Sequence, residues 1–178
     1  YDNQGYMNTG AQRSSATPPA TRTATTPAVG RDPGAPFGQG KSVPRIAMAH
    51  DIPYVATATV ADLRDLEAKV RTAMSHRGAR YLHVLVTCPL GWGTKASDSI
   101  LMARLAVRSG LFPVFEAEYG EVTATTPIRD RVPVEEYLRP QRRFAHLFGP
   151  RGDEVALERI RRMAERNIRT YHLCPREV

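Results

Sequence analysis

The sequence predicts an α/β fold with a mostly parallel sheet. Residues 53–59 and 80–87 are apolar, β-branched runs with the length and composition of buried strands. Between them the apolar side chains recur at helical spacing, at Leu63, Leu66, Val70 and Met74. A strand, a helix and a second strand in this order are typical of α/β proteins, in which helices pack on a mostly parallel sheet.

The length and composition are those of one globular domain. The chain has 178 residues, of which 42% are hydrophobic and 24% charged, which disfavours wholesale disorder and a fibrous protein. No apolar run approaches the roughly 18 residues that cross a bilayer, and the first residues lack a signal-peptide pattern. Cys88 and Cys174 cannot form a disulfide scaffold, which indicates a reducing compartment. We therefore expect a cytoplasmic protein with no membrane partner.

Four segments are expected within this one domain. They are a cofactor- and metal-binding turn at 1–12, a Ser/Thr/Pro/Gly-rich loop at 13–45, an α/β core at 46–132 and a helical C-terminal segment at 133–178. Phe37 is the only large apolar side chain of the loop before Val43, so the loop cannot build a core of its own. A loop of this length is typical of a functional or a disordered segment.

Start and stop signals place the first helix and the elements after the second strand. Thr59 lies three residues before Asp62, so we expect its hydroxyl to cap the first helix, which Gly78 ends. A second helix is predicted from Ser97 to Gly110. A further strand is predicted at 111–117.

Two more helices are predicted near the C-terminus. One begins at Pro133 and runs through Phe144, with Pro140 ending or kinking it. Asp153 is expected to cap the last helix, whose apolar face is made by Leu157, Ile160, Ala164 and Ile168.

The basic charge is concentrated in this last segment. The formal net charge is +7, and residues 139–178 carry ten of the arginines against five acidic residues. A solvated, salt-bridged helix face explains this best, and a docking surface for a partner subunit is the alternative. Nucleic acid is disfavoured as a partner, because no aromatic residues alternate with the arginines to stack bases.

The first twelve residues form an oxygen-rich turn. Asn3 offers a side-chain oxygen, and Gly5 can turn its backbone carbonyl to the same side because it has no Cβ. Such oxygens suit Mg²⁺, which often bridges to a phosphate, and Asp2 is the nearby carboxylate. Clusters of Asn and Gly are most often simple turns, so that alternative stays open.

Cys88 follows the second strand and precedes a Gly-rich turn. A lone cysteine is most often a buried, inert thiol. At the end of a core strand, however, its sulfur lies at the rim of the sheet, where ligands bind in α/β folds. The five histidines show no metal-ligand spacing with one another or with this cysteine, and His83 is expected to be a bonded core or interface residue.

These motifs occur together, in order, in one known family. The segments concerned are residues 1–12 (Tyr-Asp-Asn-x-x-Tyr-Met-Asn-Thr-Gly-x-Gln), 14–18 (Ser-Ser-Ala-Thr-Pro), 25–27 (Thr-Thr-Pro), 52–58 (Ile-Pro-Tyr-Val-Ala-Thr-Ala), 88–92 (Cys-Pro-Leu-Gly-Trp) and 143–148 (Arg-Phe-Ala-His-Leu-Phe). The chain resembles the thiamine-pyrophosphate-binding beta subunit of pyruvate:ferredoxin oxidoreductase, within the 2-oxoacid:ferredoxin oxidoreductases. The resemblance implies part of a thiamine-diphosphate-binding three-layer fold.

The resemblance also implies roles for individual residues. Asn3 and the Gly5 carbonyl would hold Mg²⁺ against the cofactor diphosphate, and Asn8 would be the catalytic residue facing the thiazolium. Cys88 would be one of four thiolates on a four-iron, four-sulfur (4Fe-4S) cluster. The remaining residues expected to shape the cofactor pocket are Tyr6, Thr9, Gly10 and Gln12.

The activity that the resemblance implies is oxidative decarboxylation of pyruvate to acetyl-CoA. The expected partners are the other subunits of the complex, pyruvate, coenzyme A, and ferredoxin or flavodoxin. The family's Gly-Asp-Gly segment and three further cysteines would precede Tyr1, so we expect the C-terminal part of a longer subunit. The alternative is a non-catalytic fragment or assembly subunit that binds neither cofactor nor cluster. The coding sequence upstream of Tyr1 discriminates between the two.

Overall fold

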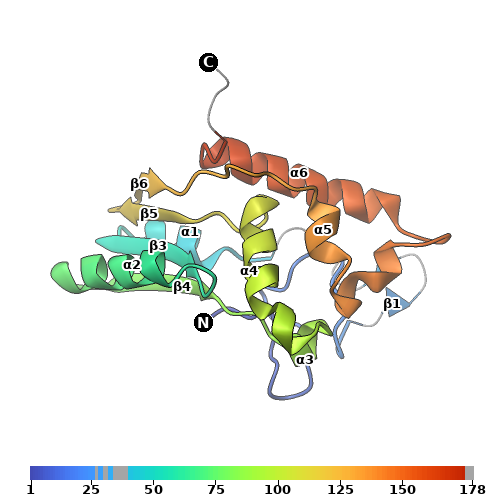
Figure 1. The fold of residues 1–178 in the computed structure, drawn as a ribbon. Coiled ribbons are helices and arrows are strands. Elements are labelled where there is room, and N and C mark those ends of the chain that lie inside the picture. Colours follow the sequence, from blue (N-terminus) through green and yellow to red (C-terminus); the bar gives the residue numbers. More distant parts are fainter. Residues whose placement is uncertain (27, 30–31, 34–39, 175–178) are drawn as a thin grey trace.

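The computed structural model describes residues 1–26, 28–29, 32–33 and 40–174 (Figure 1). Phe37 of the predicted loop lies outside the described residues. The strands are β1 (Ala28–Val29), β2 (Asp32–Pro33), β3 (Tyr54–Thr59), β4 (Arg80–Leu85), β5 (Phe115–Glu118) and β6 (Glu121–Thr125). The helices are α1 (Val43–Met48), α2 (Leu63–Ser75), α3 (Pro89–Trp92), α4 (Ser99–Arg108), α5 (Val134–Leu138) and α6 (Glu154–Thr170), with 3₁₀ helices η1 (Ala96–Asp98) and η2 (Arg142–Leu147).

The main sheet has four strands in the order β4-β3-β5-β6. β3 and β4 run parallel along their whole length, from the pair Tyr54 and Arg80 to the pair Thr59 and Leu85. β5 and β6 are added antiparallel beyond β3. Asp2 extends the parallel part on the other side of β4, because it forms a parallel bridge with Leu85. The predicted α/β class is therefore confirmed.

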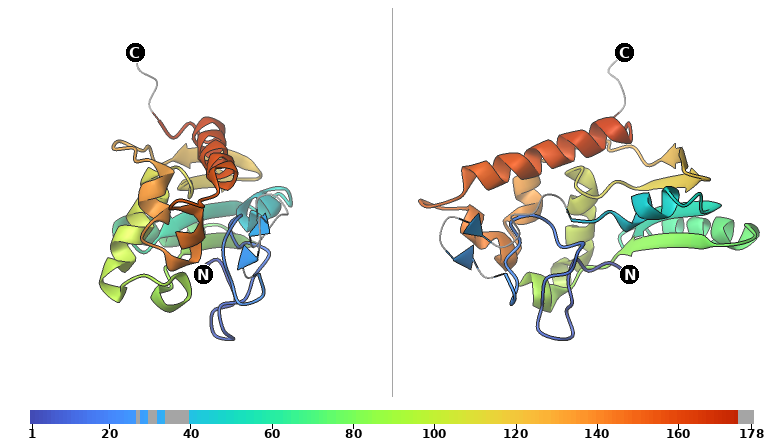
Figure 2. Two further views of the ribbon diagram at one scale, coloured as in Figure 1. Left: turned by 90° about the vertical axis from the view of Figure 1, so that its right-hand side faces the viewer. Right: turned by 180° about the vertical axis from the view of Figure 1, so that it is seen from behind.

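Helices cover both faces of this sheet (Figures 1 and 2). Tyr54 and Ala56 of β3 pack with Ala73 of α2 on one face. Val55, on the opposite face, packs with Ala47 of α1 and with residues that follow α6. Because successive strand side chains point to opposite faces, β3 is buried from both sides. This explains its continuous apolar run.

The cap of α2 differs from the prediction. The helix begins at Leu63, and the Asp62 carboxylate accepts a hydrogen bond from the Asp65 backbone N–H at 3.0 Å. The Thr59 hydroxyl instead accepts from the Ala61 N–H at 3.2 Å, before the helix starts. The expectation that Thr59 is the cap was wrong, because a capping side chain reaches only two or three residues ahead.

The predicted strand at 111–117 becomes a hairpin that starts later. The Phe112 N–H donates to the Ala106 carbonyl at 2.9 Å, so this stretch closes α4 before β5 begins at Phe115. The two-residue turn into β6 consists of Tyr119 and Gly120, with φ of 46° and 85°. Positive φ at both positions is the geometry of a tight hairpin turn.

The predicted helix from Pro133 is divided in two. α5 ends at Leu138, and the chain then forms the 3₁₀ helix η2 after Pro140, as a proline at this position favours. The prediction that Asp153 caps the last helix is confirmed. Its carboxylate accepts from the Ala156 N–H at 2.9 Å.

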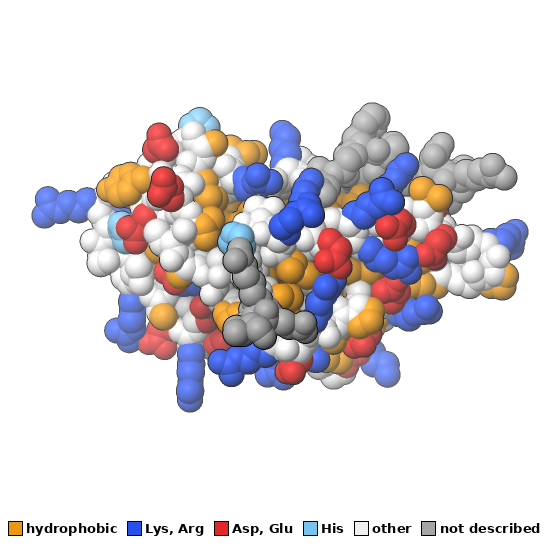
Figure 3. Space-filling model, turned by 90° about the horizontal axis from the view of Figure 1, so that it is seen from above, with side chains coloured by type: hydrophobic (Ala, Val, Ile, Leu, Met, Phe, Trp, Pro, Cys, Tyr) orange, Lys and Arg blue, Asp and Glu red, His pale blue; other side chains and the backbone are white. Residues whose placement is uncertain are grey.

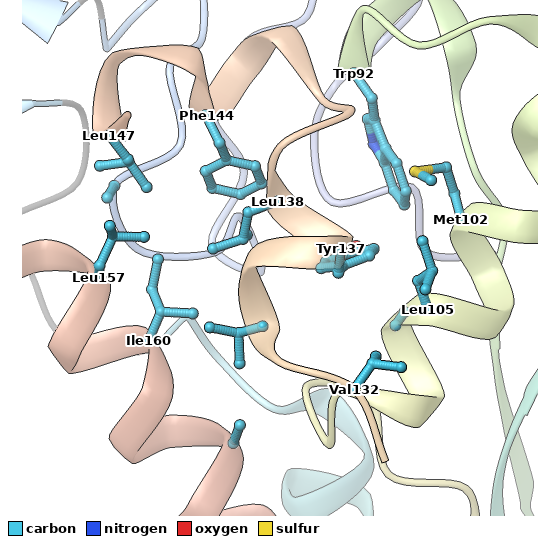
Figure 4. Close-up of a cluster of buried hydrophobic side chains, with 14 of the residues drawn as sticks. Trp92, Met102, Leu105, Val132, Tyr137, Leu138, Phe144, Leu147, Leu157 and Ile160 are labelled. Atoms are coloured by element: carbon cyan, nitrogen blue, oxygen red, sulfur yellow. The ribbon is translucent and has the colours of Figure 1, made fainter. Parts of the chain in front are cut away.

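The largest buried cluster lies away from the sheet face, among the later helices (Figure 4). Leu157 and Ile160 of α6 pack in it with Phe144 of η2. Trp92 of α3 is fully buried in the same cluster, and its ring meets Tyr137 edge-on, with centroids 6.3 Å apart. The cluster therefore fixes the short helix that follows Cys88.

The basic residues of α6 are partly neutralised by neighbouring carboxylates. Arg161 pairs with Glu135 at 2.5 Å and Arg162 with Glu158 at 3.0 Å. Figure 3, which looks down on this helix, shows basic and acidic side chains interspersed on that face. These pairs support the interpretation of a solvated, salt-bridged helix. No helix in the described ranges is long and apolar enough to cross a membrane.

Candidate functional site

The first residues are fixed to the sheet next to β4. The Asp2 N–H donates to the Val84 carbonyl at 2.8 Å, and the Val86 N–H donates to the Asp2 carbonyl at 2.9 Å. The Asp2 carboxylate lies 3.0 Å from His83 Nε2, whose other ring nitrogen bonds to the Tyr81 hydroxyl at 2.8 Å. The prediction that His83 is a bonded residue is confirmed. Asp2 thus brings the following turn to the carboxyl edge of the sheet, where ligands bind in such folds.

Gln4, at the centre of this turn, has a left-handed backbone with φ of 64°. Such a conformation costs a residue with a side chain about 1–3 kcal/mol and is found where the surroundings enforce it. Three groups do so here. The Gln4 N–H donates to the Asp2 carboxylate at 2.7 Å, the Thr17 hydroxyl donates to the Gln4 carbonyl at 2.9 Å, and Arg143 donates to Gln4 Oε1 at 2.5 Å. Strained residues held in this way are common at ligand sites.

Asn3 and Gly5, the two predicted magnesium ligands, flank Gln4. The Asn3 backbone carbonyl accepts a hydrogen bond from Trp92 Nε1 at 2.8 Å, which ties the turn to α3. Over the described ranges, neither the Asn3 side-chain oxygen nor the Gly5 carbonyl oxygen accepts a hydrogen bond. Both residues are half-buried. These two oxygens therefore retain the lone pairs that a cation requires.

A hairpin carries the other predicted pocket residues. The backbones of Tyr6 and Gln12 exchange hydrogen bonds of 2.9 and 3.0 Å, and the Thr9 hydroxyl donates to Gln12 Oε1 at 2.8 Å. Tyr6, Asn8, Thr9 and Gly10 are exposed. The loop, dark blue in Figure 2, projects from the body of the molecule. The structure thus brings Asn3, Gly5, Tyr6 and Gln12 into one turn, with Asn8, Thr9 and Gly10 at its tip, and their roles stay predictions.

Cys88 lies against the same turn. It is the N-cap residue of α3, its side chain makes no capping hydrogen bond, and its thiol is free and half-buried. A Cβ atom placed on Gly91 would lie 2.1 Å from Met7 Sδ and 3.4 Å from Cys88 Sγ. The methionine of the hairpin and the cysteine of α3 therefore converge on one glycine. The two segments that the sequence singled out, 76 positions apart in the chain from Gln12 to Cys88, meet here.

We expect Gly91→Ala to disturb this junction. The added methyl group overlaps Met7 Sδ, so the methionine must leave its position, at a cost of about 1–3 kcal/mol in stability. Thermal unfolding of the purified full-length subunit measures this. Met7→Ala is the matched variant, because Gly91→Ala should cost little when made in that background. An equal cost in both backgrounds would show that Met7 and Gly91 do not contact each other.

Arg143 is part of the site but was not predicted as such. Its side chain is buried, and its Nε donates to Gln141 Oε1 at 2.9 Å. The guanidinium lies 4.0 Å from the centre of the Trp92 ring and 5.0 Å from that of Phe144. Arg143 belongs to a segment that carried the family resemblance, but its spacing gives no sign that this particular arginine is buried.

The charge of Arg143 is perturbed by its surroundings. Burial lowers the pKa of the guanidinium to about 10, and interactions with Tyr137, Asp2 and Cys88 act in the opposite direction. Burial likewise raises the pKa of the Tyr137 hydroxyl. The arginine is therefore still a cation at neutral pH, inside the protein and close to the predicted cofactor turn.

The described residues alone do not form a complete metal site. No group of three or more His, Cys, Asp or Glu side chains there could hold a metal ion. Both ring nitrogens of His146 are buried with no hydrogen-bond partner in that part of the chain, and burial lowers its pKa. Cys174 packs with Tyr171 and Leu173 on the face of the sheet that carries Val55.

Comparisons with known proteins find relatives but no matching family model. The chain is 44% identical over 172 residues to pyruvate synthase subunit PorB of Methanosarcina barkeri. The aligned region covers 97% of this chain and 58% of that subunit. The chain is also 44% identical over 147 residues to the subunit of the same name from Methanocaldococcus jannaschii, spanning 83% of this chain and 49% of that one.

A relative with a different name is nearly as similar. Ketoisovalerate oxidoreductase subunit VorB of Pyrococcus furiosus is 40% identical over 149 residues, spanning 83% of this chain and 48% of that subunit. The chain therefore spans about half the length of the curated relatives it matches. The oxidoreductase resemblance found in the motifs agrees with both names.

Proposed function

From this similarity we propose that the chain is part of the beta subunit of a pyruvate:ferredoxin oxidoreductase. In this proposal it carries half of a magnesium–diphosphate site and one thiolate of a 4Fe-4S cluster. The observation that carries the proposal is the junction of two segments, in which Trp92 Nε1 donates to the Asn3 carbonyl and Met7 of the hairpin packs against Gly91 of α3. The turn at the start of the chain brings neutral oxygens, and the segment at Cys88 brings a thiol, to the same edge of the sheet.

The residues present fit the two groups that the family binds. The Asn3 side chain and the Gly5 carbonyl are oxygen donors without a protein hydrogen bond in the described ranges, and oxygen is the ligand type that Mg²⁺ prefers. Cys88 offers a free thiol at the start of a helix, and iron–sulfur clusters are held by cysteine thiolates. The further ligands that each group needs would come from outside the described residues.

Each residue then has a defined task. When bound, thiamine diphosphate supplies the electron sink for decarboxylation of a 2-oxoacid. Asn3 and Gly5 hold the magnesium that anchors the diphosphate, and the strained Gln4 between them keeps both oxygens in place. Asn8, at the hairpin tip, faces the reacting end of the cofactor. Cys88 would hold one iron of a cluster, whose chemistry would be one-electron transfer toward ferredoxin or flavodoxin. Coenzyme A would be the acyl acceptor.

Pyruvate is the proposed substrate, with a branched 2-oxoacid as the second candidate. The PorB relatives are 39–44% identical and the VorB relatives 38–40% identical, so the similarity favours pyruvate by a small margin. Substrate choice would rest partly on contacts from other subunits.

The test is an assay of the complete complex, purified anaerobically with its partner subunits. We expect pyruvate and coenzyme A together to reduce ferredoxin, and 3-methyl-2-oxobutanoate to be a poorer substrate. Preference for the branched acid would favour the second candidate substrate over pyruvate. A complex that contains neither cofactor nor iron would refute the proposal in favour of an assembly subunit.

A further inference from the structure

Arg143 is a buried cation without an anionic partner in the described part of the chain. Its side chain is 4% exposed, and none of the salt bridges found there involves it. Its Nη1 atom is buried and makes no hydrogen bond with the described residues. Burying a charge in this way costs several kcal/mol unless an opposite charge compensates it.

The groups that do contact the guanidinium are neutral. Two of them are the amide oxygens of Gln4 and Gln141, and the others are the ring faces of Trp92 and Phe144. Amide dipoles and aromatic faces stabilise a cation but leave its charge uncompensated. Tyr137 is not a counter-ion either, since burial raises the pKa of its hydroxyl and keeps it protonated.

Besides Tyr137, two groups that can carry a negative charge favour the charged form of this arginine, namely Asp2 and Cys88. The Asp2 carboxylate is already bonded to His83 Nε2 and to the Gln4 N–H. Within the described ranges the Cys88 side chain makes no such bond, and Cys88 begins the helical turn that ends at Trp92, on whose ring Arg143 lies. The anion that fits the unused charge is therefore the one held by Cys88.

We propose that Arg143 is a positioning residue that balances the negative charge of the iron–sulfur cluster bound by Cys88. This rests on the proposed function. One-electron reduction adds a negative charge to the cluster and changes no covalent bond of the protein. A buried cation stabilises the reduced form more than the oxidised form. Since net charge sets the reduction potential of such clusters, the arginine raises it and makes the cluster a better electron acceptor.

The experiment is a redox titration of the anaerobic complex with dithionite as reductant, followed by electron paramagnetic resonance. The signal assigned to this cluster is the one that Cys88→Ala removes. In Arg143→Gln, which replaces the guanidinium by a shorter, uncharged amide, we expect the reduction equilibrium constant of this cluster to fall at least tenfold. For one electron this is a shift of about 59 mV to more negative potential.

Two variants serve as controls. Arg139→Gln removes an exposed arginine that lies 4.3 Å above the Phe148 ring, and it should leave the potential unchanged. Arg143→Lys keeps the charge, so it should restore most of the potential. If Arg143→Gln fails to retain the cluster, the cluster content and potential of Arg143→Lys decide whether the charge of residue 143 is what matters. Recovery of cluster and potential supports the charge role, and continued loss overturns it.

The other outcomes are distinct. An intact cluster with an unchanged potential in Arg143→Gln would refute the proposal for Arg143 and leave the proposed function standing. Weaker binding of thiamine diphosphate at an unchanged potential would show that the arginine serves the diphosphate turn through Gln4, and this also overturns the proposal. A wild-type complex without any cluster would refute the proposed function itself.

Discussion

Replacing Cys88 with alanine is expected to remove the proposed 4Fe-4S cluster and, with it, the proposed electron delivery to ferredoxin. The clusters of this class need a full set of thiolates, so the loss of one leaves an iron without its ligand. Substitution of a group that only supports a metal ligand already lowers metal affinity or activity about 10–100-fold. Removal of a direct ligand should therefore lower the rate of ferredoxin reduction by roughly 100-fold or more. The measurements are the iron content, the broad visible absorption that bleaches on reduction, and the rate of ferredoxin reduction.

The fold should tolerate this change. Cys88 makes no side-chain capping bond to α3, and the main anchor of that helix is the buried Trp92. Cys174→Ala is the matched control, because that half-buried thiol packs in a different cluster. Unchanged circular dichroism and complex assembly in both variants, with cluster loss in one, would support the assignment. Full iron content in Cys88→Ala would contradict it.

Local patterns in the sequence predicted the parallel strand pair and the helix between its strands. β3, α2 and β4 lie where the apolar runs and the helical spacing placed them, because each is defined by residues near in sequence. The cap at Asp153 was predictable for the same reason. The turn at the start of the chain was singled out by its oxygen donors and Cys88 by its position after a strand, and the structure places them against one another through Trp92 and Met7.

Features that depend on distant contacts were not predictable. Nothing near Gln4 in the sequence indicates a left-handed backbone, which Thr17 and Arg143 hold from 13 and 139 residues away. β6 was missed because its side chains are mostly exposed, so it lacks the alternating apolar face that marks a half-buried strand. The charge of Arg143 is unusual only because several segments enclose it, and spacing along one segment cannot show that.

Replacing Asn3 with alanine is expected to weaken cofactor binding and to spare the cluster. The substitution removes the side-chain oxygen proposed for Mg²⁺ but keeps the backbone carbonyl that accepts from Trp92 Nε1, so the connection to α3 survives. We expect the affinity for thiamine diphosphate at a fixed magnesium concentration to fall about 10–100-fold. Calorimetric titration of the cofactor-free complex measures this, and raising the magnesium concentration should recover part of the loss by mass action.

Asn8→Ala separates binding from catalysis in the same turn. Asn8 lies at the exposed tip of the hairpin, and in the proposal it faces the reacting end of the cofactor rather than the diphosphate. Its loss should therefore lower kcat and leave the affinity for thiamine diphosphate within a few-fold of wild type. Asn3→Ala should instead lower the affinity for thiamine diphosphate, which reduces the rate when the cofactor is limiting. Its kcat should approach that of the wild type when cofactor and magnesium are saturating. If both variants change affinity and kcat together, the two asparagines share one structural role, and the division of the turn into an anchoring and a reacting end is wrong.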